Sequence, residues 1–181
     1  MPSKSTLTSW NWSELDVLIV NQGEGLDLIE ALSGQKRSED EDAVETLKQL
    51  AALDQLKTHL TWIVMTRGSQ GVAASVLLQG QSERTLFSLA ASKPRQVRDT
   101  TGAGDTFAGY LVSSLAKTAE SKGTDNQGRL APRTRPESED EVVACLSRAK
   151  MAAAMAVEIK GAMESIPTED QVEERLRSES K

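Results

Sequence analysis

The segment DTTGAGDTF, residues 99–107, constrains this chain more than any other feature of its sequence. Two glycines and an alanine leave the backbone almost bare, so consecutive amide N–H groups can turn inward and form a concave set of donors. Helical spacing follows over residues 107–117, and the free N–H groups and dipole of a helix N-terminus would point at the same place. The segment therefore predicts an anion-binding site between a strand and a helix.

Asp105 lies at the mouth of this predicted nest of amides. A carboxylate there can accept the proton of a hydroxyl group that attacks a phosphorus atom, while the amides stabilise charge on the transferred group. Taken alone, Asp105 could equally serve only as the N-cap of the following helix. The segment is neither a P-loop, because no Gly-Lys-Ser/Thr follows, nor a dinucleotide fingerprint, because the GxGxxG spacing is missing.

Strand and helix patterns alternate around this segment. Short apolar runs rich in β-branched residues predict strands at residues 15–20, 62–65, 72–78 and 84–90. Helical spacing, with Gly34 as a stop and Ser138 and Glu141 as a capping box, predicts helices at residues 26–32, 42–60, 107–117 and 138–160. The order predicts an α/β sheet with parallel pairing through a crossover helix.

Changes in composition predict the domain organisation. Residues 1–14 read as an irregular lead-in, residues 15–170 as one nucleotide-binding region and residues 171–181 as a charged tail. Within the main region, residues 118–140 are polar and aperiodic, which favours a disordered insertion.

Charge and cysteine content exclude several classes of function. The net charge of −6 argues against a general nucleic-acid binder, which needs a basic face. The single cysteine, Cys145, permits no intrachain disulfide and lies in an Ala-rich helical pattern typical of a buried residue. No apolar run has the length of a membrane span, and the first residues lack the apolar core of a secretory signal. We expect a cytoplasmic protein without a membrane partner, with the nucleus as a further location.

Two more segments carry polar residues after predicted strands. Asn21, Gln22, Gly23 and Glu24 follow the first strand, and Thr66, Arg67, Gly68, Ser69, Gln70 and Gly71 follow the second. Asn21 could be a simple turn residue, and Glu24 a first-turn carboxylate favoured by the helix dipole. The glycines of the second segment could likewise be ordinary turn glycines.

Together these motifs resemble, in sequence order, those of the ribokinase family of carbohydrate kinases, the PfkB family. DTTGAGDTFAGYL is similar to the second signature of that family. The resemblance implies that Asp105 is the catalytic base and contacts both the sugar and the nucleotide. It further implies an anion hole at Gly102, Ala103 and Gly104, with Gly104 also touching the nucleotide.

The other motifs imply the cofactors. The Asn-x-x-Glu pair, Asn21 and Glu24, resembles the motif that positions Mg²⁺ and phosphate, and residues 66–71 resemble the nucleotide loop for ATP. Residues 152–167 resemble the stretch that closes over adenine, and Lys150 falls at an adenine contact where the family more often has Asn or His. The resemblance implies a K⁺ site, mostly of backbone carbonyls, at Asp99, Thr101, Ala156, Ile159, Gly161 and Ser165.

The implied fold is a partial, doubly wound three-layer α/β/α sheet of the ribokinase type, without the N-terminal half and lid that complete such a kinase. The implied reaction transfers the ATP γ-phosphoryl group to a sugar hydroxyl, with D-ribose favoured and D-ribose 5-phosphate as product, in D-ribose catabolism. A fructokinase, an adenosine kinase or a non-catalytic nucleotide-binding remnant are the alternatives. The complete protein could be a homodimer, and the chain alone is expected to be poorly soluble because a sheet edge lies open.

Overall fold

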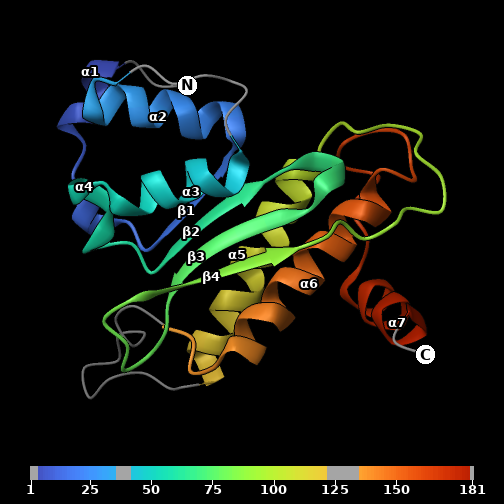
Figure 1. Ribbon diagram of the computed structural model, residues 1–181. Helices are drawn as coiled ribbons and strands as arrows, with labels where there is room; N and C mark the ends of the chain where they lie inside the picture. The colour runs from blue at the N-terminus through green and yellow to red at the C-terminus, as the bar shows by residue number, and fades with distance from the viewer. Residues whose placement is uncertain (1–3, 36–41, 122–134, 180–181) are drawn as a thin grey trace. The chain divides into compact units, whose positions relative to one another are not determined.

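The computed structural model describes residues 4–35, 42–121 and 135–179, and these residues form two compact units (Figure 1). The first unit comprises Met1–Ser88 and Arg135–Glu137, and the second comprises Leu89–Thr134 and Ser138–Lys181. Most of the predicted insertion at 118–140 lies outside the described residues. The domain bounds given above stay a prediction.

A four-stranded sheet of order β1-β2-β3-β4 forms the frame of the first unit. The strands are β1 (Val17–Asn21), β2 (Trp62–Thr66), β3 (Val72–Leu77) and β4 (Arg84–Leu89). β1 pairs with β2 in parallel, with Val17 opposite Trp62, and β2 pairs with β3 antiparallel. Parallel neighbours require a crossover, which the helices between β1 and β2 supply. The predicted strands and the parallel pairing are confirmed.

Two helices of the crossover, α2 (Gln22–Ser33) and α3 (Ala43–Ala52), cover one face of this sheet (Figure 1). Their buried leucines pack with Ile63, Met65 and Ala73 from the strands. At Gly25 the approach is so close that a Cβ atom would lie 2.8 Å from the Met65 side chain. Gly34 ends α2 in the left-handed conformation, with φ of 74°, as the sequence predicts.

The first unit differs from the sequence-based expectation in two places. The lead-in is not irregular throughout, because it contains helix α1 (Lys4–Ser9) and a short 3₁₀ helix, η1 (Trp12–Glu14). Trp12 is buried in the core of the sheet and its indole N–H donates to the Leu7 carbonyl. The helix expected over 42–60 is divided into α3 and α4 (Asp54–Lys57), because Leu53 is extended with ψ of 131°.

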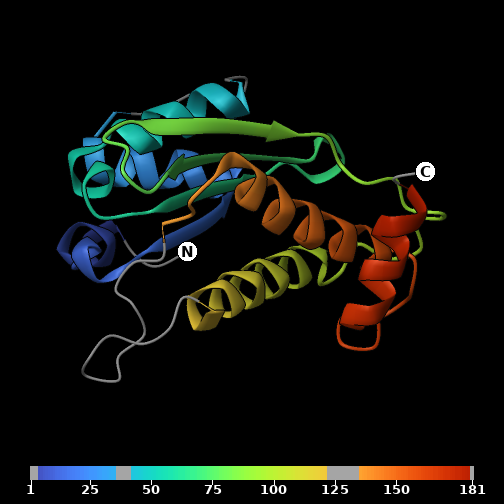
Figure 2. The same ribbon diagram turned by 90° about the horizontal axis from the view of Figure 1, so that it is seen from below.

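The second unit is helical: α5 (Ala103–Ser121) and α6 (Glu139–Ala156) run antiparallel, and α7 (Glu169–Glu179) packs near the end of α6 (Figure 2). Ser138 caps α6 by accepting from the Glu141 amide, which is one half of the predicted capping box. α5 begins four residues earlier than expected and α6 ends at Ala156 rather than at Lys160. The charged tail is largely helical, because Val172 packs on Met151 and Ala152 and gives α7 a buried side.

Candidate functional site

The segment that carries the predicted chemistry is a closed turn that leads straight into α5. Gly102 has φ of 78°, and its carbonyl accepts from the amide of Thr106 at 2.8 Å. The Ala103 amide donates to the Thr100 carbonyl at 3.3 Å, which tightens the turn. Ala103, Gly104 and Asp105 therefore form the first turn of α5, where backbone N–H groups have no acceptor within the helix.

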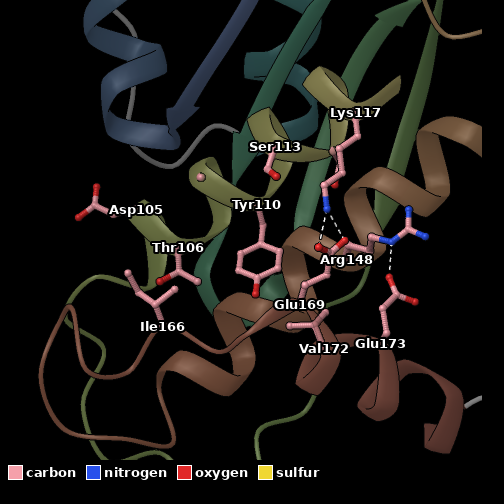
Figure 3. Close-up of a pocket in the computed structure, with 12 residues that line it drawn as sticks. Asp105, Thr106, Tyr110, Ser113, Lys117, Arg148, Ile166, Glu169, Val172 and Glu173 are labelled. Atoms are coloured by element: carbon pink, nitrogen blue, oxygen red, sulfur yellow. Dashed lines mark hydrogen bonds and ion pairs between the residues drawn. The ribbon is translucent and has the colours of Figure 1, made fainter. Parts of the chain in front are cut away.

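Asp105 projects from this first turn and is exposed. Figure 3 shows its carboxylate pointing away from the end of the helix. A carboxylate in a first helical turn is also favoured by the helix dipole, so its position fits both a catalytic base and a stabilising first-turn acid.

Asp99 holds the turn from its other side. Its Oδ1 accepts from the Thr101 amide at 3.0 Å and its Oδ2 from the Gly161 amide at 3.1 Å. Hydrogen bonds from the Thr101 side chain and amide, followed by that from the Gly161 amide, lower the pKa of Asp99 to about 2. The carboxylate is thus ionised at neutral pH and joins the turn to the loop that follows α6.

A close backbone approach makes the same connection. A Cβ atom at Gly102 would lie 3.1 Å from both Cα and Cβ of Ala162. In addition, the Val157 carbonyl accepts from the amides of Arg98 and Asp99. Residues 98–102 and 157–162 are therefore packed backbone to backbone.

The residues implied as K⁺ ligands lie on these two loops or next to them, with Ala156 at the end of α6 and Ser165 after residue 162. Asp99 and Gly161 are hydrogen-bonded to each other, and Thr101 bonds to the same carboxylate. The Ala156 carbonyl accepts from the Ile159 amide at 3.3 Å, and the buried Ser165 hydroxyl donates to the Ala162 carbonyl at 3.1 Å. Carboxylate, hydroxyl and carbonyl oxygens are the hard donors that an alkali cation takes, so the residues fit such an ion. The ion itself stays a prediction.

The Asn-x-x-Glu motif lies in the first unit, at the junction of β1 and α2. Asn21 Oδ1 accepts from the Glu24 amide at 2.9 Å, and Glu24 Oε2 accepts from the Asn21 amide at 2.8 Å, so the pair forms a capping box. This geometry is compatible with a purely structural helix cap and also with the Mg²⁺-positioning role that the resemblance implies. Mg²⁺ takes carboxylate oxygens as ligands, so Glu24 suits the role that the resemblance implies, although the described residues form no cluster of three or more side chains that could hold a metal by themselves.

The predicted nucleotide loop is the tight turn between β2 and β3 in the first unit. It contains the 3₁₀ helix η2 (Gly68–Gln70), with left-handed φ values of 55° at Gly68 and 99° at Gly71. The Arg67 amide donates to the Gly71 carbonyl at 2.8 Å, and the Arg67 guanidinium donates to the Ser88 hydroxyl at 3.0 Å. Gly68, Ser69 and Gln70 are exposed, which leaves their backbone open to a ligand.

Lys150, the implied adenine contact, lies on α6 in the second unit and is partly buried. Its Nζ donates to the Ala90 carbonyl at 3.1 Å. The residues that the resemblance implies for nucleotide binding are divided between the two units. The second unit contains Asp99, Asp105 and Lys150, and the first contains Glu24 and residues 66–71.

A pocket of about 270 Å³ beside Asp105 was not anticipated from the sequence (Figure 3). α5, α6 and α7 enclose it, and Tyr110, Ile166 and Val172 supply apolar lining. Two ion pairs, Lys117–Glu169 and Arg148–Glu173, connect α7 to α5 and α6 across it. The hydrogen bond and charge of Lys117 lower the pKa of Glu169, and Tyr110 donates to the Pro167 carbonyl at 2.6 Å. No sequence motif marks these pairs, because their partners are far apart along the chain.

Comparison with known proteins places these observations in context. The family model described as pfkB family carbohydrate kinase matches residues 3–169. The ribokinase of Cryptococcus neoformans var. grubii serotype A in complex with ADP is 30% identical, with a TM-score of 0.72 over 97% of this chain and 48% of that one.

Two more distant structures share the fold. The ribokinase of Arabidopsis thaliana, complexed with ribose and ATP, is 22% identical with a TM-score of 0.60, over 97% of this chain and 43% of that one. The fructokinase of Xylella fastidiosa with bound ATP is 19% identical with a TM-score of 0.66, over 94% and 45%. The chain thus spans about half the length of the structures it matches. In the described part of the chain, no helix combines the length and apolar character that a membrane crossing needs.

Proposed function

The chain belongs to the pfkB family of carbohydrate kinases and has part of the mixed α/β ribokinase-like fold, and from this premise we propose that it is the C-terminal, ATP-binding half of a sugar kinase. The observation that carries the proposal is the closed turn at Gly102, with Asp105 in the helical turn that follows it. This arrangement supplies two things that phosphoryl transfer requires: backbone donors for a phosphate and a carboxylate beside them.

In the proposed reaction, the Asp105 carboxylate accepts the proton of a sugar hydroxyl. As that proton leaves, the hydroxyl oxygen bonds to the γ-phosphorus of ATP and the bond between the γ-phosphorus and the bridging oxygen of ADP breaks. The amides of Gly104 and Asp105, which follow Ala103 in the first turn of α5, donate to the oxygens of the transferred group and stabilise their charge. Mg²⁺, when bound with the phosphates, offsets their negative charge, and Glu24 is the residue proposed to help hold it.

We propose ribose as the sugar, with K⁺ at the Asp99–Gly161 loops. The fungal protein with 30% identity is a ribokinase, and this supports ribose over fructose, since the fructokinase is only 19% identical. A second candidate is a nucleotide-binding protein without transfer activity. The chain as given spans less than half of each relative, so nucleotide binding by this chain is proposed and tested separately from transfer to a sugar.

Asp105→Asn tests the catalytic role. We expect phosphoryl transfer to ribose, fructose or adenosine, measured as ADP formation, to fall by about 10³-fold or more, while ADP affinity from calorimetry stays within about threefold. Asp140→Asn is the matched control, since Asp140 is an exposed acid in the first turn of α6.

The outcomes separate the two candidates. Equal transfer by the Asp105→Asn variant and the wild-type chain would remove the catalytic-base assignment. Nucleotide binding without transfer in the wild-type chain favours the non-catalytic protein, and absence of both contradicts the proposed function.

A further inference from the structure

Arg175, on α7, is a buried arginine that none of the sequence motifs includes. Its side chain is 9% exposed, and its guanidinium has three acceptors on three different segments. Nε donates to Glu179 at 2.8 Å, and Nη2 donates to Glu158 at 3.3 Å and to the Lys93 carbonyl at 3.5 Å. A buried charge is tolerated only when it is paired and hydrogen-bonded, so this set of partners holds the guanidinium in one place.

Glu158 makes a second contact with the segment that contains Lys93. Its Oε1, which accepts from Arg175, also accepts from the amide of Arg95 at 2.5 Å. One carboxylate therefore links α7, the loop after α6 and residues 93–95. Glu158 is itself only 18% exposed, which limits the competition of water for these bonds.

Of the segments that Glu158 joins, residues 93–95 lead along the chain into the turn at Gly102, and residues 157–161 pack against that turn. Val157, the neighbour of Glu158, accepts from the Arg98 and Asp99 amides at 2.8 and 3.3 Å. Asp99 then accepts from the amide of Gly161, and Gly102 lies against Ala162. Every step from Arg175 to Gly102 is a direct contact within the second unit.

We propose that Arg175 is a positioning residue for the turn at Gly102. Its guanidinium fixes Glu158, and Glu158 fixes the 157–161 loop against residues 95–99, so that the bond between Asp99 and Gly161 keeps the turn closed. Arginine suits this role because its planar fork can donate to separate acceptors at once, whereas lysine offers a compact point charge. The inference rests on the proposed function only in assuming that the turn receives a nucleotide phosphate.

The test compares Arg175→Gln, Arg175→Lys and Glu158→Gln in the full chain. Arg148→Gln is the matched control, because it also removes an arginine ion pair to α7, with Glu173, but does not touch the 157–161 loop. Hydrogen exchange of the Gly161 and Thr101 amides, followed by NMR, reports whether the Asp99 bonds stay closed, and the Leu111 amide in the middle of α5 reports global stability.

We expect Arg175→Gln to speed exchange at Gly161 and Thr101 by about tenfold or more relative to the control, with Leu111 changing equally in both variants. Arg175→Lys should restore part of the protection. If Arg175→Gln does not fold, Glu158→Gln decides the question, since it keeps an acceptor for the Arg95 amide and removes only the charge. The proposal is overturned if the Gly161 amide exchanges at the same rate in Arg175→Gln as in the Arg148→Gln control. If Arg175→Gln does not fold, the same result in Glu158→Gln overturns it.

ADP titration of the same variants separates this inference from the proposed function. If the turn binds a phosphate, ADP affinity should fall in Arg175→Gln by about the same factor as the loss of protection, and by less in Arg148→Gln. A wild-type chain that binds no ADP contradicts the proposed function, while the exchange measurement still decides whether Arg175 positions the turn.

Discussion

Gly102 meets two constraints at once, and each arises from a different part of the chain. Its φ of 78° is required for the backbone to turn into α5, and a Cβ atom there would lie 3.1 Å from Ala162, so a side chain fits only if the neighbouring loop shifts. Gly80 has a similar φ of 75°, but a Cβ atom there would meet none of the described residues within 4 Å. A comparison of the two glycines therefore separates the cost of the backbone conformation from the cost of the close approach.

Gly102→Ala should lower the free energy of unfolding by about 2–4 kcal/mol, because a left-handed non-glycine residue costs about 1–2 kcal/mol and the clash with Ala162 adds to it. Gly80→Ala, the matched control, should lose only the first part. The measurement is urea denaturation followed by far-ultraviolet circular dichroism. Equal losses in the two variants would mean that the 157–162 loop moves aside without cost.

Asp99 makes the stability of the turn depend on pH. Its pKa of about 2 lies below the value of about 3.9 for an unfolded aspartate, so the folded chain binds this proton more weakly than the unfolded chain. The stabilisation is therefore complete above about pH 4 and is lost as the pH falls towards 2.

We expect Asp99→Asn to remove this contribution, so that the stability of the variant falls less steeply than that of the wild-type chain between pH 4 and pH 2. Urea midpoints measured at half-unit intervals across that range provide the check. Parallel curves for the two proteins would show that the amides of Thr101 and Gly161 do not hold the carboxylate.

At the scale of elements, the same residues can cap a helix and bind a ligand, and α2 is the clearest case. Asn21 and Glu24 satisfy each other's backbone amides, so their presence is explained by helix capping alone. Asp42 performs the capping role for α3, where its side chain accepts from the amides of Val44 and Glu45, and it belongs to no family motif. The two caps therefore offer a comparison between structural and ligand-binding roles.

Glu24→Gln should change stability by less than about 0.5 kcal/mol, because glutamine can replace glutamate in a capping box. If Glu24 helps to hold Mg²⁺, the affinity for ADP in the presence of Mg²⁺ should fall by about tenfold, measured by calorimetry with and without the metal. Asp42→Ala is the control: it should lose about 1 kcal/mol of stability and leave nucleotide affinity unchanged. The same ADP affinity in the presence of Mg²⁺ for Glu24→Gln and the wild-type chain would assign Glu24 to capping alone.

At the scale of the whole molecule, β1 is an end strand of the sheet that the described residues form. Among the described strands, β1 is at the end of the order and pairs only with β2, although its Val17, Leu18 and Ile19 are apolar and half-buried. Strands in parallel sheets are usually covered on both faces and paired on both sides. An unpaired apolar edge is a template for pairing with another chain.

We expect the chain to self-associate through β1 as its concentration rises, and Val17→Lys to reduce this association. Val143→Lys, at an exposed apolar position of helix α6 and therefore on no sheet edge, is the control and should leave it unchanged. Light scattering coupled to size-exclusion chromatography gives the molar mass of each variant across a range of concentrations. The same mass for the wild-type chain and Val17→Lys at every concentration would contradict the role of the edge.

Local chemistry is what the sequence determined by itself. Bare glycines before an amphipathic run predicted the turn at Gly102 and the helix after it, Gly34 predicted the end of α2, and apolar runs predicted the strands, because each depends on neighbours within a few residues. Tertiary packing decided the rest. The helical lead-in depends on the hydrophobic core that buries Trp12, and α7 depends on Met151 and Ala152, which bury Val172. The break between α3 and α4 lies inside one continuous helical pattern, so the local sequence does not mark it. The connection from Arg175 through Glu158 to Asp99 could not be predicted from the sequence either. A buried ion pair forms only once folding brings together its charges, which here lie 17 residues apart.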